Sequence, residues 1–285
     1  MAQSFEALLK TPDILVLPGA YDALSARVAV RAGAKAVYMT GFGVAGAGFG
    51  VPDIGLVNAE QMIERVRVIA GSIAPVPLIA DGDNGHGGPL NVARLVRAYE
   101  QSGAQCIQLE DQVSPKRCGH MEGKEVIPLA EAAAKIRAAA EARSSCAFKI
   151  MARTDARATH DLDEALRRGE AFLKAGADIL FIEAPRTEDE MAKVAATFKG
   201  TPLLANLVED GKTPMLSPEA LQQMGYKIAL YPISALLAAS AALEQVYAKL
   251  LHTKAEARER VTFSQYNDIV GLPDFLATAK RFDRR

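Results

Sequence analysis

The fold is decided by residues 163–183, DEALRRGEAFLKAGADILFIE, in which an amphipathic run ends at a glycine and an apolar run follows. Asp163–Lys174 has the apolar spacing of a helix that buries one face. Gly176 then supplies a helix stop, because glycine adopts the left-handed conformation that closes a last helical turn. Ile179–Glu183 has the length and composition of a buried strand. This stretch therefore predicts one helix followed directly by one buried strand.

The same unit recurs from near the start of the chain to about residue 250, and Gly33 and Gly103 end earlier amphipathic runs in the same way. The apolar runs are Ile14–Leu17, Ala36–Thr40, Pro77–Asp81, Cys106–Glu110, Phe148–Arg153, Ile179–Glu183, Pro202–Asn206 and Ile228–Tyr231. Apolar strands alternating with helices predict a parallel sheet covered by helices. Eight such units predict an α/β fold of the (β/α)₈ TIM-barrel type. A doubly wound open sheet is the alternative that the spacing leaves open.

The length of 285 residues fits one barrel, for which ~250 residues is typical, although two small domains would also fit. We expect the barrel at residues 1–252 and extra C-terminal helices at residues 253–285. This extension carries Phe263, Tyr266, Phe275 and Phe282 outside the repeat. Because such aromatic side chains need burial, we expect the extension to lie at a subunit interface.

Charge and composition exclude several classes of protein. The net charge is −1 and no basic stripe stands out, which argues against a nucleic-acid partner. The N-terminal MAQSFEALLK has no apolar signal core, and no uncharged apolar run reaches the ~18 residues of a membrane helix. Three cysteines, an odd number, favour free thiols over a disulfide framework. We therefore expect a cytoplasmic protein with neither a nucleic-acid nor a membrane partner.

Polar residues gather where the apolar runs end. They are Thr40, Asp81, Asp83, Glu110, Asp111, Arg153, Asp155, Glu183 and Asn206. In a barrel the carboxyl ends of the strands build the active site, so these side chains should converge on one mouth. Converging carboxylates suit Mg²⁺ or Mn²⁺. For a single aspartate, capping of the next helix is the simpler explanation, but repetition over five strands favours a site.

Residues 112–128 form a long polar connection that contains Pro115-Lys116-Arg117-Cys118-Gly119-His120. A thiol among cationic side chains favours the thiolate, and long loops in compact domains are often lids. An exposed spectator thiol in a basic loop is the alternative. Cys106 and Cys146 lie in or beside apolar runs and are expected to be structural.

One motif is a decoy. Gly41-Phe42-Gly43-Val44-Ala45-Gly46 matches the dinucleotide-binding pattern G-x-G-x-x-G and follows an expected strand. The chain continues AGFGVP, a poor helix start, whereas the dinucleotide site requires a helix there. We expect a flexible or substrate-facing loop instead.

Taken together, the motifs resemble the isocitrate lyase / phosphoenolpyruvate mutase superfamily, and within it the methylisocitrate-lyase and 2,3-dimethylmalate-lyase type. The resemblance runs from about Leu17 to Leu250. It rests on PGA (18–20), VPD (51–53), DGDNG (81–85), LEDQ (109–112), KRCGH (116–120), MARTDA (151–156), IEAP (182–185) and AN (205–206). The KRCGH element resembles the catalytic loop of the lyase branch.

The resemblance implies a (β/α)₈ barrel with Mg²⁺ at its mouth, in a homotetramer whose C-terminal helices exchange between subunits. It implies that Asp81 binds the metal directly and that Asp53, Asp83 and Glu110 hold its waters. The residues that it makes catalytic are Cys118, Arg153, His120 and Glu183, with Arg153 and Glu183 facing substrate. The residues that it assigns to binding of a small carboxylate substrate are Thr40, Gly41, Phe42, Lys116, Gly119 and Asn206. It makes Cys118 the acid that protonates the leaving carbanion.

The chain departs from the methylisocitrate-lyase pattern at several points. It has DGDNG for the more usual DADTG, Thr40-Gly41-Phe42 for Ser-Gly-Gly, and a proline at Pro185. GKEVIP (123–128) and GKTP (211–214) are more similar to the dimethylmalate-lyase and plant petal-death branch.

The expected activity is Mg²⁺-dependent cleavage of the C–C bond of a 2-hydroxy di- or tricarboxylate, which gives a 2-oxo acid such as pyruvate and a second carboxylate. Three alternatives share the scaffold: an oxaloacetate hydrolase or decarboxylase, a phosphonate-forming mutase, and a non-catalytic 2-oxo-acid-binding protein. Because one barrel hosts many reactions, fold alone does not separate them.

Overall fold

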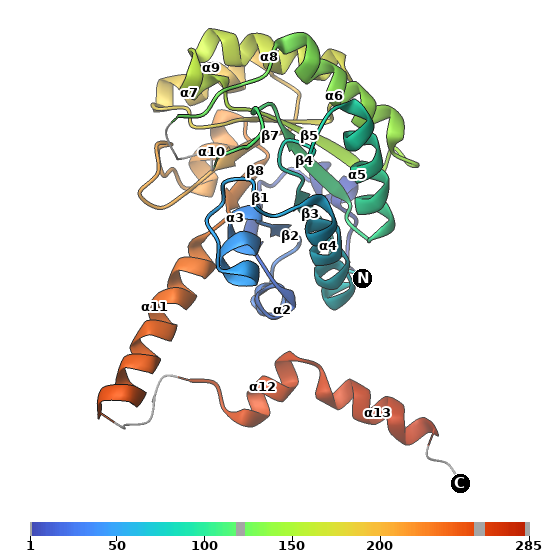
Figure 1. The fold of residues 1–285 in the computed structure, drawn as a ribbon, viewed down its shortest axis with the longest axis vertical. Coiled ribbons are helices and arrows are strands. Elements are labelled where there is room, and N and C mark those ends of the chain that lie inside the picture. The colour runs from blue at the N-terminus through green and yellow to red at the C-terminus, as the bar shows by residue number, and fades with distance from the viewer. Residues whose placement is uncertain (1, 118–122, 254–259, 283–285) are drawn as a thin grey trace.

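The computed structural model describes residues 2–117, 123–253 and 260–282. Eight parallel strands close into one barrel in the order β1 to β8 (Figure 1). The strands are β1 Leu15–Ala20, β2 Val37–Met39, β3 Leu78–Asp81, β4 Cys106–Glu110, β5 Lys149–Thr154, β6 Ile179–Ile182, β7 Leu203–Asn206 and β8 Ile228–Tyr231. Pairing of β1 with β8, from Leu15 with Ile228 onward, closes the ring. The predicted (β/α)₈ barrel is confirmed, and the open-sheet alternative is wrong.

Helices follow seven of the strands and cover the barrel. They are α2 Ala23–Arg31, α4 Ala59–Ile73, α5 Pro89–Gln101, α6 Leu129–Ala142, α8 Leu162–Lys174, α9 Glu188–Thr197 and α10 Pro218–Met224. Each turns its apolar face inward, as α4 does with Met62, Val66 and Ile69, all fully buried. Short helices precede or interrupt the series at α1 Phe5–Leu9, α3 Gly41–Gly43, η1 Val44–Gly48 and α7 Ala156–Thr159.

The interior of the barrel is filled by a separate apolar cluster. Leu17, Ile79, Met151 and Ile228 point inward and are fully buried. At the amino-terminal end of the strands, α1 plugs the barrel with Phe5, whose backbone N–H donates to the Gln105 side chain at 2.8 Å. The opposite end is therefore the one that is open to a ligand.

The last part of the chain lies largely outside the barrel wall, although the Arg27 side chain of α2 donates to the Ile269 carbonyl at 3.3 Å. The helix after β8, α11 Ser234–Ala248, buries none of its residues, and Figure 1 shows it running away from the barrel. It continues as η2 Lys249–Thr253, and α12 Phe263–Ile269 and α13 Leu272–Phe282 follow. The sequence correctly predicted C-terminal helices here. None of the described helices is long and apolar enough to cross a membrane.

Two local expectations are wrong. Residues 41–48, expected as a loop, are helical, because the Thr40 side chain caps the turn by accepting from the Gly43 N–H at 3.4 Å. Cys146, expected to be structural, is exposed, whereas Cys106 is fully buried in β4. Both of these thiols are free.

Candidate active site

A cavity of 240 Å³ opens at the carboxyl ends of the strands. Eight of the residues expected in the site line it: Thr40, Phe42, Asp53, Asp81, Glu110, Lys116, Arg153 and Asn206. Asp83 and Gly41 contact this lining, because Asp83 pairs with Lys116 and the Gly41 N–H donates to Asp81. Cys118, Gly119 and His120 lie outside the described residues. The sequence therefore predicted most of one spatial cluster from strand ends that are far apart in the chain.

Asp81, the last residue of β3, is held by three donors. Its Oδ2 accepts from the Gly41 N–H at 3.2 Å, and its Oδ1 accepts from the Asp83 N–H and the Gln108 side-chain amide, both at 3.1 Å. Burial, followed by the nearby Asp83 carboxylate, raises the pKa of Asp81 to about 6. The hydrogen bonds thus fix the side chain in position, while its surroundings disfavour the ionised carboxylate.

The turn after β3 forces Asp83 toward the cavity. Asp83 and His86 have positive φ values of 49° and 52°, a conformation that costs L-residues free energy. A hydrogen bond from the Gly85 N–H to the Gly82 carbonyl at 3.0 Å closes this turn. The glycine-rich stretch therefore serves to bring a second carboxylate beside Asp81.

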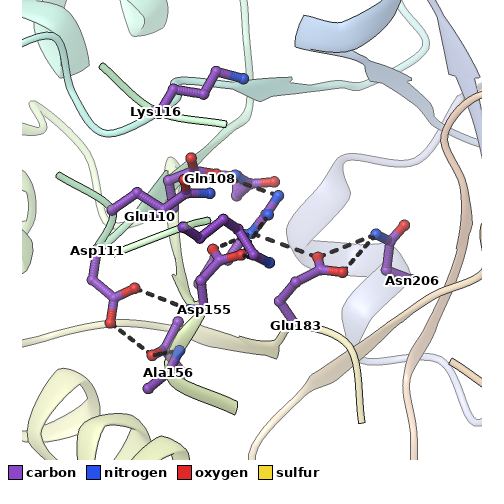
Figure 2. Close-up of polar contacts among 12 residues, drawn as sticks. Gln108, Glu110, Asp111, Lys116, Asp155, Ala156, Glu183 and Asn206 are labelled. Carbon is purple, nitrogen blue, oxygen red and sulfur yellow. Dashed lines mark hydrogen bonds and ion pairs between the residues drawn. The ribbon is translucent and has the colours of Figure 1, made fainter. Parts of the chain in front are cut away.

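Lys116 lies between two of the expected metal-site carboxylates, above Glu110 in Figure 2. Its Nζ is 2.5 Å from Asp53 Oδ1 and 2.8 Å from Asp83 Oδ1. Burial opposes its charge, but four carboxylates, Asp83 first, raise the pKa of Lys116 well above its ordinary value. The sequence placed Lys116 against substrate; in this structure it neutralises the acidic side of the cavity.

The donor set fits a divalent cation. Glu110 Oε1 is buried without a hydrogen-bond partner, and burial raises the pKa of Glu110 and of Asp53 despite their cationic neighbours. Buried carboxylates in excess of cations are what Mg²⁺ or Mn²⁺ neutralises in proteins. Within the described part of the chain no three His, Cys, Asp or Glu side chains already converge as a metal centre. Asp53 and Asp83 are instead paired to Lys116.

Arg153 forms the centre of the cavity floor. Its Nε and one terminal nitrogen donate to Asp155 at 2.9 and 3.0 Å, and its other terminal nitrogen is 3.3 Å from Glu110 Oε2. Its guanidinium carbon lies 5.1 Å from the centre of the Phe181 ring, a cation–π contact. Burial opposes this charge, but Asp155 and Glu110 raise the pKa of Arg153 well above its ordinary value. This residue is therefore a fixed, permanent cation facing the carboxylates.

Asn206 forms the next part of the cavity lining, and the buried Glu183 holds its side chain. Figure 2 shows their side chains pointing toward each other, and the Asn206 amide donates to Glu183 Oε2 at 3.2 Å. Glu183 Oε2 is also 3.5 Å from Arg153 Nε. Glu183 is fully buried, so it orients Asn206 and Arg153, and Asn206 faces the cavity.

The opposite wall, formed by β8 and the segments that follow β7 and β8, is apolar, and the sequence analysis did not assign it. Val208, Leu230, Pro232 and Ile233 line this side of the cavity, and the predicted Phe42 adds a further apolar side chain to the lining. Leu230 belongs to β8, the other three residues follow β7 or β8, and no polar pattern marks any of them. This wall therefore had no sequence signal that separates it from ordinary core.

Three polar residues of the site were also missed or left without a role. Tyr38 lines the cavity and donates to the Gln108 side chain, which in turn donates to Asp81. Asp155 clamps Arg153. A tyrosine and a glutamine inside otherwise apolar runs were the available signal for the first two.

The comparisons with known proteins decide the family. Residues 5–251 match the phosphoenolpyruvate phosphomutase family. The chain belongs to the phosphoenolpyruvate mutase / isocitrate lyase superfamily. It is 46% identical to the 2,3-dimethylmalate lyase of Eubacterium barkeri, over 95% of this chain and 94% of that protein. It is 40% identical to the 2-methylisocitrate lyase of Bacillus subtilis (strain 168), over 87% of this chain and 80% of that one.

Solved structures of other members of the superfamily superpose closely on this chain. Oxaloacetate acetylhydrolase with 3,3-difluorooxalacetate gives a TM-score of 0.95 at 34% identity, covering 100% of this chain and 97% of the other. Phosphonopyruvate hydrolase with oxalate and Mg²⁺ gives 0.85 at 30% identity, covering 97% and 96%. The superfamily resemblance read from the motifs is therefore confirmed, and relatives of this chain include C–C lyases.

Proposed function

We propose that this protein is a Mg²⁺-dependent lyase that cleaves a C–C bond of a 2-hydroxy di- or tricarboxylate of the 2,3-dimethylmalate or 2-methylisocitrate type. The observation that supports this best is the two-sided cavity, in which Asp81, Glu110 and Arg153 face an apolar wall that contains Val208 and Pro232. The charged side suits a hydroxyl and its neighbouring carboxylate. The apolar side suits the alkyl-bearing fragment of the substrate.

Asp81 would bind the metal directly, and Asp53, Asp83 and Glu110 would hold its waters. When bound, Mg²⁺ supplies Lewis-acid polarisation of the substrate's hydroxyl and carboxylate oxygens. Lys116 would then exchange its pairing with Asp53 and Asp83 for contact with substrate. Asn206, oriented by Glu183, and the backbone at Thr40, Gly41 and Phe42 would hold the substrate carboxylates.

Loss of the hydroxyl proton lets the C–C bond break, and the electron pair of that bond leaves with the second fragment. One product is a 2-oxo acid, and the carbanion that remains takes up one proton. Arg153 stabilises the negative charge that develops, because its position is fixed before the reaction begins. We propose that Cys118 donates the proton and that His120 and Gly119 belong to the same loop element. Arg117, the residue before Cys118, lines the cavity.

An oxaloacetate hydrolase is the second candidate, because the solved acetylhydrolase superposes so closely. A hydrolase must hold an attacking water, whereas the wall formed by Val208, Leu230, Pro232 and Ile233 offers no polar side chain. This wall therefore favours the lyase.

The proposal is tested by incubating the protein with Mg²⁺ and a panel of 2-hydroxy and 2-oxo di- and tricarboxylates, with products identified by mass spectrometry. We expect a 2-oxo acid from an alkyl-substituted 2-hydroxy acid, and no product in excess chelator. Oxalate and acetate from oxaloacetate as the main reaction would select the hydrolase. Turnover that persists in chelator would remove the metal from the proposal.

Cys118→Ala gives a sharper test of the proton donor. General-acid catalysis contributes ~10²–10⁴-fold, so turnover of the best substrate should fall on this scale while Mg²⁺ binding is retained. Cys146→Ala is the matched control, because Cys146 is exposed. A Cys118→Ala enzyme with near-normal turnover would exclude this role.

We further propose a cytoplasmic homotetramer in which the extension, residues 253–285, lies at a subunit interface. In this extension Phe263, Phe275 and Phe282 are 81%, 68% and 81% exposed. A groove of 390 Å³ beside β1 and α2, lined by Leu15, Val16 and other apolar residues, offers burial for a helix of the extension from a second copy. Sedimentation should show a tetramer at micromolar concentration; a monomer would contradict the proposal.

A further inference from the structure

The loop after β4 returns to the barrel through a short two-stranded ladder. Gln112 and Val126 form an antiparallel bridge, the Val113 N–H donates to the Glu125 carbonyl at 3.0 Å, and the Ile127 N–H donates to the Asp111 carbonyl at 2.9 Å. Lys124 stands on the returning arm of this ladder. Its position is therefore fixed by backbone hydrogen bonds that also fix the start of the loop.

Lys124 is turned inward, toward the end of β5. Its Nζ is 2.7 Å from Asp155 Oδ1, and the two side chains are 2% and 0% exposed. Burying a lysine is costly unless its charge is matched in place. An exposed pair of similar length, Lys193 with Asp163 at 2.6 Å, carries no such cost, because its side chains are 54% and 79% exposed. The free-energy cost of burying the Lys124–Asp155 pair therefore needs an explanation, whereas the exposed pair has no such cost.

Asp155 connects Lys124 to the floor of the cavity. Its Oδ1 accepts from both Lys124, at 2.7 Å, and a terminal nitrogen of Arg153, at 3.0 Å, while its Oδ2 accepts from Arg153 Nε at 2.9 Å. Its backbone N–H donates to Asp111 Oδ1 at 3.0 Å, and Figure 2 shows Asp111 beside it. The carboxylate is held at both ends, so its plane has little freedom to rotate.

Two other carboxylates lie near the Arg153 guanidinium. Glu183 Oε2 is 3.5 Å from its Nε, and Glu110 Oε2 is 3.3 Å from a terminal nitrogen. With the Asp155 carboxylate fixed, the guanidinium makes its two short bonds there and only longer contacts to the others. If Asp155 turned, the guanidinium could shift toward Glu183 and change the direction in which it faces the cavity.

We propose that Lys124 is a positioning residue for Arg153: it holds the Asp155 carboxylate in the plane that clamps the guanidinium, and so couples the seating of the loop's returning arm to the cavity's central cation. This inference rests on the proposed function for the role of Arg153 but not for the geometry. Arg168 pairs with Asp111 at 3.0 Å and so supports the residue that accepts the Asp155 backbone N–H. Asp111, a ladder residue, holds the Asp155 backbone N–H, whereas Lys124 is the ladder residue whose side chain pairs with the Asp155 carboxylate in the described part of the chain.

The test compares Lys124→Met, Lys124→Arg and the control Lys193→Met, each at a temperature well below its own unfolding transition. One readout is the crystal structure of each variant; the other is calorimetric binding of oxalate in the presence of Mg²⁺. Neither depends on turnover of any 2-hydroxy acid, and the crystal structure needs no metal either, so it tests the Arg153–Asp155 geometry even if the proposed function fails. Lys124→Arg, which keeps the charge, is the second variant should Lys124→Met yield no folded protein.

We expect the Arg153–Asp155 pair to lose its two-bond geometry in Lys124→Met. Weakening one hydrogen bond between a charged group and its ligand lowers affinity on the order of 10–100-fold, so oxalate binding should weaken by about this factor. Lys124→Arg should restore part of this loss, and Lys193→Met should match the wild type. A lowered unfolding temperature with unchanged oxalate affinity, or an Arg153–Asp155 pair that keeps its geometry in Lys124→Met, overturns the proposal and leaves Lys124 a merely structural residue.

Discussion

The interior of the barrel has two unlike ends. At the amino-terminal end of the strands, Phe5 and Leu8 of α1 close an apolar column, and both are at most 3% exposed. At the carboxyl end, Asp81, Glu110 and Arg153 are almost as deeply buried, yet they carry charge. Burial stabilises the first end through the hydrophobic effect and penalises the second through desolvation. A similar degree of burial therefore stabilises the fold at the amino-terminal end, whereas at the carboxyl end it costs free energy and keeps charged groups in the cavity.

The largest effect that would test this contrast is expected from Asp81→Asn. Loss of the proposed direct metal ligand should reduce Mg²⁺-dependent turnover by on the order of 10³-fold. Stability should respond in the opposite sense. Because the folded-state pKa of Asp81 is raised to about 6, the folded protein loses stability as pH rises from about 4 to 6, and the penalty is complete at pH 8.

In chelator at pH 8, Asp81→Asn should thus unfold at no lower a temperature than the wild type. Mg²⁺ should raise the unfolding temperature of the wild type only. Thermal unfolding with and without Mg²⁺ measures this, and Asp163→Asn on the exposed face of α8 is the control. A variant that is both inactive and much less stable would show that Asp81 stabilises the fold as an ordinary core residue does.

Phe5→Ala tests the other end. Truncation of a fully buried phenylalanine costs about 3–5 kcal/mol, or roughly 2–4 °C of unfolding temperature per kcal/mol in a domain of this size. The value of kcat/KM at 25 °C should stay unchanged, because the plug does not contact the cavity. Leu90→Ala, at an 87% exposed position, is the control and should change little. A Phe5→Ala enzyme that folds normally but loses activity would show that the two ends are coupled.

The smallest effect is expected from Tyr38→Phe. This variant tests where the apolar column ends and the charged cavity begins. Its ring belongs to the apolar column, while its hydroxyl donates to Gln108 beside Asp81. Loss of this hydrogen bond should lower the free energy of unfolding by about 1–2 kcal/mol and reduce kcat/KM by ~10-fold. Tyr226→Phe removes a similarly buried hydroxyl, bonded to the Met191 carbonyl, away from the cavity and should lower stability alone. Equal effects of the two variants on activity would place Tyr38 outside the site.

The sequence predicted the barrel well because strand position follows from local pattern. The run Ile228–Tyr231 is β8 with the same bounds, and Pro77–Asp81 differs from β3 by one residue. Strand ends also located Asp81, Glu110 and Arg153, because a parallel barrel brings all carboxyl ends together. Topology alone was enough to gather these side chains.

Pairing within the site could not be predicted in the same way. Lys116 and Lys124 reach their partners from a loop, and neither spacing nor periodicity shows how far a flexible side chain turns inward. Lys124 and Asp155 are 31 positions apart. The capped turn at Thr40 was missed because glycine has low helix propensity, so the glycine-rich segment that follows gave no helix signal.

Gly41 has a consequence for how this pocket can change over time. A Cβ at position 41 would lie 2.6 Å from Asp81 Oδ2 and 3.3 Å from Asp83 Oδ1, so any larger residue would displace a carboxylate. Phe42, the next residue, lines the cavity on its apolar side. Divergence toward new substrates, in evolution or in a directed-evolution library, is therefore closed at one position and open at its neighbour. A library that varies Phe42, Val208 and Ile233 while keeping Gly41 would change the shape of substrate that the cavity accepts. It would keep the carboxylates of Asp81 and Asp83 in place.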